Sequence, residues 1–169
     1  MKTTIRIGTS GWNYPHWQGL FYPEGEPKAK WLEYYARHFS TVEANTTFYH
    51  LPRPATVENW RKRTPASFLW TVKASRYITH IKKLRDPHDS LERFYEAIGG
   101  FGEKLGPILF QLPPMLKFNE GVFEAFCREL HPGHRYALEV RHPDWVRGEA
   151  LRSLQAHVLF TSLLEGIRG

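Results

Sequence analysis

The 169-residue sequence contains a single cysteine, Cys127, and no apolar run long enough to cross a bilayer. A membrane-spanning helix needs about 20 consecutive apolar residues. One cysteine excludes an internal disulfide and a zinc cluster built from cysteines, and its place in an apolar helical pattern predicts a buried, unreactive thiol. Residues 1–4 lead into a strand pattern rather than into the apolar core of a signal peptide. We therefore expect a cytoplasmic protein without membrane contact.

Several functional motifs are also missing. Neither Gly-x-Gly-x-x-Gly nor Gly-x-x-x-x-Gly-Lys occurs, which disfavours a Rossmann or P-loop nucleotide domain. There is no His-x-His, no His-Glu-x-x-His and no Gly-x-Ser-x-Gly, so spacing supports neither a metal site nor a nucleophilic serine. The oxygen and nitrogen atoms that a divalent metal binds are present in Glu43, His80, Glu139 and His142. This match of atom types is the only basis for a metal site here. The sequence leaves the cofactor undetermined.

The composition favours a packed domain with an anionic partner. Apolar residues make up 41% and aromatic residues 15%, which is enough for a core, and the formal net charge is +6. Five basic residues and no acidic one lie between Lys73 and Arg85. Such a local excess of positive charge favours a phosphorylated small molecule or a nucleic acid as the partner.

Short apolar segments alternate with segments of helical periodicity along the whole chain. This order predicts parallel strands joined by right-handed crossovers, in a doubly wound open sheet or a closed barrel. We expect one domain over residues 1–169, an incomplete TIM-barrel-like α/β fold with about six parallel strands and helices outside. The predicted strands are Thr4–Gly8, Thr41–Asn45, Phe68–Lys73, Ile108–Leu112, Tyr136–Glu139 and Val158–Thr161, and the predicted helices are Pro27–Phe39, Ala55–Arg63, Ser90–Ile98, Asn119–Leu130 and Val146–Gln155.

Near the ends of the central strands, polar side chains alternate with apolar ones, so the polar side chains are expected on one face of the sheet. In the segment Thr41–Asn45 the polar positions alternate with Val42 and Ala44, and the same alternation recurs in the later strands. Barrels and open α/β sheets place their ligands at the carboxyl ends of parallel strands. The candidate catalytic residues are Glu43, Lys73 and Glu139, and the candidate ligand-binding residues of these strands and the loops after them are Asn45, Arg76, His80, Gln111, Arg141 and His142.

Aromatic residues follow the same strands and form the predicted rim of the site. They are suited to stacking on bases or sugars, or to covering the barrel mouth, and the sequence does not choose between these roles. Trp31, Trp60 and Trp70 lie inside predicted elements and are expected in the core. The rim residues are Trp12, Tyr14, Trp17, Phe48, Tyr49, Tyr77 and Trp145.

The motifs that carry these residues resemble those of the YecE-like family, a domain of unknown function numbered 72. The matching segments are Ile7–Trp12, Phe21–Pro23, Val42–Tyr49, Val72–Ala74 with Thr79-His80, Leu109–Pro114 and Glu139–Trp145. The resemblance implies a TIM-barrel-like fold with these motifs at the strand ends, and no established reaction. By analogy with barrels of the xylose-isomerase and endonuclease IV type, a role on phosphodiesters stays open.

The last residues, 160–169, do not match the continuation expected from this family. We therefore expect a C-terminally truncated barrel whose exposed edges favour self-association. Three functions stay open: a barrel that binds or hydrolyses a phosphorylated or nucleic-acid ligand, a glycoside hydrolase using Glu43 and Glu139, and a non-catalytic or inactive copy. Whether the chain is an enzyme is not decided by its sequence.

Overall fold

The computed structural model describes residues 5–156 and 160–163, and its centre is a parallel sheet. Five strands follow one another in the order β1-β2-β3-β4-β5, and every neighbouring pair is parallel. Each strand therefore reaches the next through a crossover that contains a helix. The predicted α/β fold with a parallel sheet is confirmed. The strands are β1 (Thr41–Ala44), β2 (Leu69–Lys73), β3 (Leu105–Gln111), β4 (Tyr136–Val140) and β5 (Phe160–Leu163).

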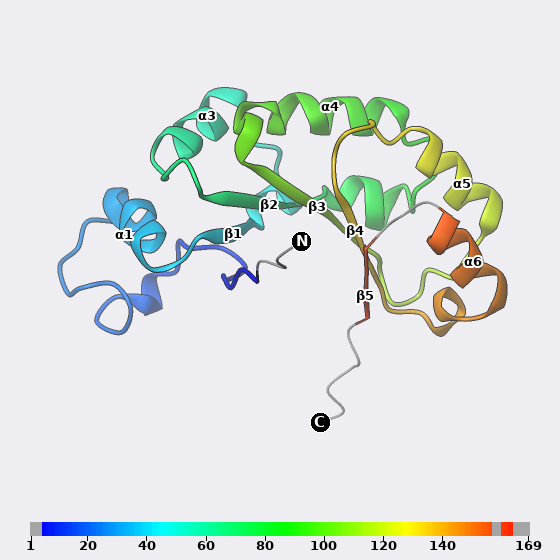
Figure 1. The fold of residues 1–169 in the computed structure, drawn as a ribbon, viewed down its shortest axis with the longest axis horizontal. Helices are drawn as coiled ribbons and strands as arrows, with labels where there is room; N and C mark the ends of the chain where they lie inside the picture. The colour runs from blue at the N-terminus through cyan, green and yellow to red at the C-terminus, as the bar shows by residue number, and fades with distance from the viewer. Residues whose placement is uncertain (1–4, 157–159, 164–169) are drawn as a thin grey trace.

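The longer helices lie in an arc around one face of the sheet (Figure 1). A single helical turn, α2 (Thr46–Tyr49), continues directly from β1 and carries two of the predicted rim aromatics. No helix in the described part of the chain is long and apolar enough to cross a membrane. The helices of the arc are α1 (Trp31–His38), α3 (Pro54–Lys62), α4 (His88–Ile98), α5 (Glu120–Arg128) and α6 (Gly148–Ala156).

Burial alternates along the central strands in the predicted phase. Val42 and Ala44 of β1 are buried, whereas Thr41 and Glu43 are half-buried, and β2 and β3 show the same alternation. Since successive side chains of a strand point to opposite faces, the apolar set packs under the helices and the polar set lies on the other face. The polar residues of three strands therefore share one side of the sheet.

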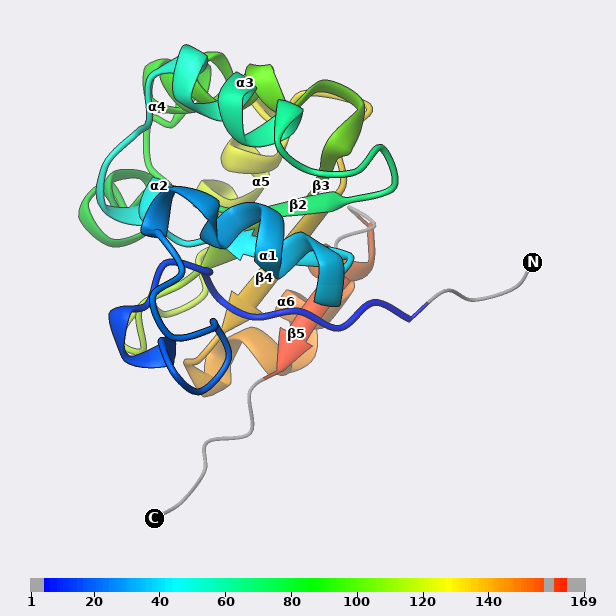
Figure 2. The same cartoon turned by 90° about the vertical axis from the view of Figure 1, so that its left-hand side faces the viewer.

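The first predicted strand, Thr4–Gly8, is wrong. Residues 5–8 form no strand, and only Ser10 bridges to Glu43. Figure 2 shows this segment passing alongside α1. A Cβ at Gly8 would lie 2.2 Å from the Thr41 carbonyl oxygen, so the backbones approach more closely than a residue with a side chain allows. Ile5 and Ile7 stay largely exposed.

Other boundaries differ by smaller amounts. Within the described residues the sheet has five strands, where about six were predicted. The last is β5 instead of Val158–Thr161, of which residues 158–159 lie outside the described part. The helix predicted over Pro27–Phe39 divides into a 3₁₀ turn, Lys28–Lys30, and α1. Asn119, the first residue of the predicted helix Asn119–Leu130, caps α5, because its Oδ1 accepts a hydrogen bond from Val122 N at 3.0 Å. Burial raises the pKa of the Cys127 thiol to about 12, as expected for an unreactive cysteine.

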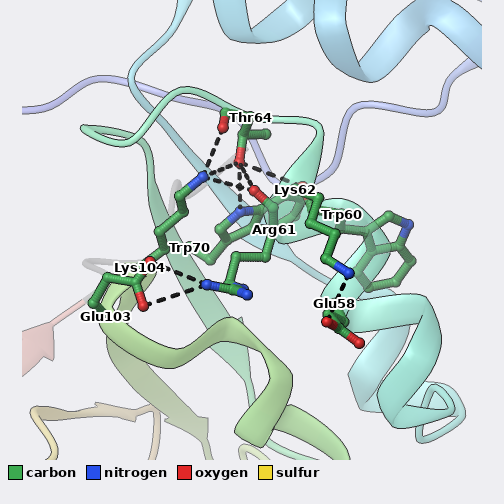
Figure 3. Close-up of polar contacts among 8 residues, drawn as sticks. All are labelled: Glu58, Trp60, Arg61, Lys62, Thr64, Trp70, Glu103 and Lys104. Carbon is green, nitrogen blue, oxygen red and sulfur yellow. Dashed lines mark hydrogen bonds and ion pairs between the residues drawn. The ribbon is translucent and has the colours of Figure 1, made fainter.

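Lys104 ties the end of α3 to the start of β3 (Figure 3). Its ammonium donates to the carbonyl oxygens of Arg61 and Thr64, both at 2.6 Å, and the residue is 7% exposed. The last carbonyls of a helix have no partner within the helix, and a cation there also interacts favourably with the helix dipole. Burial lowers the pKa of Lys104. This ammonium therefore anchors α3 at the end of the sheet opposite the predicted site.

Candidate functional site

The carboxyl ends of β3 and β4 carry three hydrogen-bonded side chains. Gln111 and Glu139 lie opposite each other in the strand register, and Gln111 Nε2 donates to both carboxylate oxygens of Glu139, at 2.7 and 2.8 Å. Arg141 Nε donates to Glu139 Oε1 at 2.8 Å. Glu139 is buried, while 38% of the Arg141 side chain is exposed. The buried carboxylate thus holds an exposed guanidinium at the strand ends.

Two further cations follow β2. Lys73 ends the strand with its ammonium 4.8 Å from the centre of the Phe48 ring, and Arg76 is exposed in the next turn. Within residues 5–156, neither Lys73 nor Arg76 forms an ion pair with an acidic side chain. Lys82, from the same basic stretch of sequence, differs because it lies 3.8 Å from a carboxylate oxygen of Asp86. The positive charges of Lys73 and Arg76 are therefore available to an anion.

His80 lies among these cations on a π-helical turn, Tyr77–Ile81. Its ring meets Phe48 edge-on, with 5.1 Å between ring centres. The pKa of His80 is lowered, first by burial and then by the positive charges of Arg76, Lys73 and Arg141. Cations from three places, β2, the turn after it and the end of β4, thus all affect the pKa of one imidazole. Short π-helical segments frequently occur at functional sites.

The Thr79 hydroxyl contacts one ring nitrogen of His80. Thr79 Oγ1 lies 2.9 Å from His80 Nδ1 and 3.3 Å from the Ser75 carbonyl oxygen. A neutral imidazole whose proton lies on Nδ1 can accept a proton at Nε2 from a ligand or a water molecule.

Glu43 lies on β1, the strand next to β2 at the edge of the sheet. Ser10 Oγ donates to its Oε1 at 2.7 Å, and the bridge between Ser10 and β1 holds the two residues in register. Glu43 is only half-buried, which distinguishes it from the buried Glu139. Ser10 therefore enters the site as a donor to Glu43.

Four of the predicted ligand-binding residues line one open cavity of about 450 Å³: Trp12, Tyr14, Asn45 and Tyr49. Lys28 and Arg63 add positive charge to its lining. Gly11 makes the arrangement possible, because its φ is +93° and an added Cβ would lie 2.8 Å from the Tyr14 hydroxyl, which donates to the Ser10 carbonyl oxygen. The Asn45 Oδ1 atom is buried without a hydrogen-bond partner. Phe48 and Tyr49 pack edge-on at 5.0 Å, which connects this cavity with the cations near Phe48.

Three other predicted ligand residues take part in local packing instead. Trp145 is 2% exposed, packs against Phe118 at 5.1 Å and donates its indole N–H to the Leu116 carbonyl oxygen. Trp17 packs partly buried against the apolar core. His142 Nδ1 accepts a hydrogen bond from Asp144 N and caps the turn Pro143–Val146. Trp145 is thus a core residue, and its assignment to the rim is wrong.

No group of three or more histidine, cysteine, aspartate or glutamate side chains within the described residues is arranged to hold a metal ion. Glu43, His80, Glu139 and His142 therefore do not come together as ligands in this arrangement. Glu139 is engaged by Gln111 and Arg141, and the Nδ1 atoms of both histidines already have partners.

Comparisons with known proteins identify the family. The model of the family described as "Protein of unknown function DUF72" matches residues 6–165. The chain belongs to the DUF72 family. UPF0759 protein YecE of Escherichia coli is 34% identical over 152 residues, which cover 89% of this chain and 53% of YecE. UPF0759 protein YunF of Bacillus subtilis is 30% identical over 149 residues, which cover 83% of this chain and 52% of YunF. The chain thus spans about half the length of these curated relatives.

Solved DUF72 structures are similar as well. The crystal structure of a DUF72 family protein from Thermotoga maritima matches with a TM-score of 0.80 and 30% identity, over 92% of this chain and 63% of that one. A DUF72 family protein from Enterococcus faecalis matches with a TM-score of 0.75 over 95% of this chain and 60% of that one, and at 19% identity it supports the fold alone.

In this DUF72 chain the sequence motifs explain most of the site but not all of it. Thr79 and Ser10 lie within the family motifs, but their hydrogen bonds to His80 and Glu43 become visible only in the folded structure. Lys28 lies in the 3₁₀ turn before α1 and Arg63 directly follows α3, within segments predicted as helices, so nothing in the sequence connects them with the cavity. Trp60 was expected in the core alone and also lines the cavity.

Proposed function

We propose that the cations at the strand ends bind the phosphate of a phosphorylated small molecule or a nucleic acid. The observation that carries this proposal is the position of the Phe48 ring, which contacts both the Lys73 ammonium and the His80 ring at the end of β2. The lowered pKa of His80, to which the charges of Arg76, Lys73 and Arg141 contribute after burial, is consistent with this arrangement. Only Arg141 among the three is paired with a carboxylate of the described residues. Unpaired cations gathered around a neutral imidazole repel one another, and an anion relieves that repulsion.

Each residue has a distinct part in the proposed complex. Lys73 and Arg76 supply charge, and Arg141 supplies a planar guanidinium held in place by Glu139. Gln111 keeps the Glu139 carboxylate in position from the neighbouring strand. Glu43 and the Nε2 atom of His80 are the groups suited to proton transfer, if the bound ligand reacts.

The fold that we propose for this site is an incomplete TIM-barrel-like domain formed by the single chain. Support comes from five parallel strands in sequential order with the longer helices in an arc outside them. Ligand sites of TIM barrels lie at the carboxyl ends of the strands, where Lys73, Gln111 and the Glu139–Arg141 pair lie in this chain. A complete barrel, with strands beyond β5, would add residues to the same ring.

The glycoside hydrolase interpretation has less support. It needs Glu43 and Glu139 as a cooperating pair, one of which donates or accepts a proton at the glycosidic oxygen. Both oxygens of Glu139 already accept hydrogen bonds from Gln111 or Arg141. Glu139 is thus better suited to holding Arg141 than to reacting with a sugar.

Binding of ribose 5-phosphate and of a short single-stranded DNA tests the proposed function. We expect both probes to bind, and expect Lys73→Ala and Arg76→Ala to weaken both. Arg128→Ala removes an exposed positive charge from α5, on the helix layer, and is the matched control. Equal affinities for the wild type and the two strand-end variants would contradict the proposal.

A further inference from the structure

The cavity lined by Trp12, Tyr14 and Tyr49 is distinct from the cations around His80. Its volume of about 450 Å³ lies within the range of small-molecule sites, roughly 300–1,000 Å³. Trp12 is fixed by edge-on contacts with Trp60 and Trp70, at 5.1 and 5.2 Å between ring centres. Tyr49 is 59% exposed and packs edge-on against Phe48. One wall is therefore rigid, and the exposed ring of Tyr49 is accessible to a ligand.

Asn45 contributes to this cavity a side-chain oxygen that lacks a hydrogen-bond partner among the described residues. Its Oδ1 atom is shielded from water and has no donor among the described residues, which is unfavourable for a buried acceptor. The last torsion of an asparagine side chain is broad, so the amide can turn and offer both its carbonyl oxygen and its NH₂ to the cavity. A ligand with an adjacent donor and acceptor would satisfy both groups.

The lining chemistry favours a planar base over a sugar. No aspartate or glutamate is among the residues that line the cavity in the described chain, so the hydroxyl groups of a sugar would find few acceptors. Aromatic rings stack on the faces of bases, and an asparagine amide pairs with the adjacent N–H donor and ring nitrogen acceptor of adenine. Lys28, which lines the cavity and forms no ion pair with a described residue, suits the electron-rich face or the phosphate of such a ligand.

We propose that this cavity binds an adenine-type purine base, with Asn45 as its polar contact and Trp12, Tyr14 and Tyr49 as its stacking surfaces. The inference rests on the proposed function for the phosphate, since a purine in this cavity and a phosphate at Lys73 and Arg76 together define a nucleotide. The Phe48–Tyr49 contact connects the two parts of the site. The ligand class is therefore a purine nucleotide or a purine-containing single strand.

Adenosine, which has no phosphate, separates this inference from the proposed function. We expect adenosine to bind the wild-type chain and to change the fluorescence of Trp12 and Trp60, which line the cavity. Asn45→Ala should weaken adenosine binding roughly 2-fold to 12-fold, and Tyr49→Ala at least about 5-fold. Asn59→Ala, at an exposed position of α3, is the matched control for Asn45→Ala and should leave the affinity unchanged.

Ribose 5-phosphate is the complementary probe. Lys73→Ala should weaken its binding while adenosine binding stays at the wild-type level. If ribose 5-phosphate fails to bind and adenosine still depends on Asn45 and Tyr49, the proposed function fails and the purine site stands. No adenosine binding, or adenosine binding that both cavity variants leave intact, overturns the purine site. Equal competition by ribose or methyl glucoside, with the same sensitivity to Asn45→Ala, also overturns it in favour of a sugar site.

Discussion

Gln111 Nε2 on β3 donates to both carboxylate oxygens of Glu139 on β4, directly across the strand register. This contact joins neighbouring strands at the polar face and fixes the carboxylate that orients Arg141. A buried carboxylate is stable only when its oxygens have donors. The pair is therefore both a structural contact between strands and a support for the proposed phosphate site.

The first prediction concerns this contact. Gln111→Leu removes the amide donors of a buried carboxylate, so we expect the free energy of unfolding to fall by about 1–3 kcal/mol. Urea denaturation measures the change, and Gln155→Leu, at an exposed position of α6, is the control for the added leucine. Equal losses in both variants would show that the Gln111–Glu139 contact contributes nothing specific.

The second prediction concerns the salt dependence of single-stranded DNA binding. If Lys73 contacts a phosphate, Lys73→Ala should reduce the slope of log affinity against log salt by about 0.7. Arg76→Ala should have a similar effect, and Arg128→Ala should keep the wild-type slope. Measurements of fluorescence anisotropy at several salt concentrations give the slopes directly. A wild-type slope in Lys73→Ala would argue against a phosphate contact at β2.

The third prediction concerns the pKa of His80. Burial and the charges of Arg76, Lys73 and Arg141 lower it, so Arg76→Ala should raise it toward its ordinary value of about 6.5. Bound ribose 5-phosphate should also raise it, because its negative charge favours the imidazolium. NMR titration of the His80 ring protons measures both effects, with Arg128→Ala as the control. A His80 pKa that does not respond to phosphate would place the anion elsewhere.

The same lowered pKa has a consequence for stability. Between the folded and the unfolded pKa of His80, the unfolded chain binds more protons than the folded chain. The contribution of neutral His80 to stability is therefore fully present above about pH 6.5 and decreases as the pH falls through that window. His80→Asn, which keeps a polar group without this titration, should flatten the pH dependence of the urea midpoint over that window.

The fourth prediction concerns Lys104. Lys104→Met removes the ammonium donor of the Thr64 carbonyl oxygen and one of the donors of the Arg61 carbonyl oxygen, so we expect a loss of about 1–3 kcal/mol in unfolding free energy. The lowered pKa of Lys104 means that the unfolded chain binds more protons between the folded pKa and about 10.5. The unfolding free energy of the wild type should therefore increase relative to that of Lys104→Met as the pH rises through this window. Lys62→Met, at an exposed lysine of α3, is the control.

The sequence predicted the parallel α/β fold and the polar phase of the strands because both depend on local periodicity. Alternation of polar and apolar residues in Thr41–Asn45 directly reports which side chains lie under the helices. The segment before Gly8 has the same local pattern as a strand. Its failure to form one depends on a close backbone contact with Thr41, which no local pattern reports.

Parts of the site depended on long-range contacts in the same way. Trp145 follows β4 as a rim residue would, but the apolar residues Phe118 and Phe123 from the β3–α5 connection and α5 draw its ring into the core. The division between the cations near His80 and the cavity beside Asn45 also became visible only in three dimensions. Sequence spacing assigns all of these residues to strand ends and does not say which of them face one another.

The burial of the Lys104 ammonium has a chemical consequence as well. The neutral, accessible amine of a lysine attacks an acetylating reagent, whereas three oxygens of Arg61 and Thr64 surround the nitrogen of Lys104. Exposed side chains such as Lys62 will be modified in the native protein, while Lys104 becomes reactive only when α3 separates from the start of β3. The rate at which Lys104 is acetylated, followed by mass spectrometry of the peptides, would therefore report how often α3 separates from the start of β3.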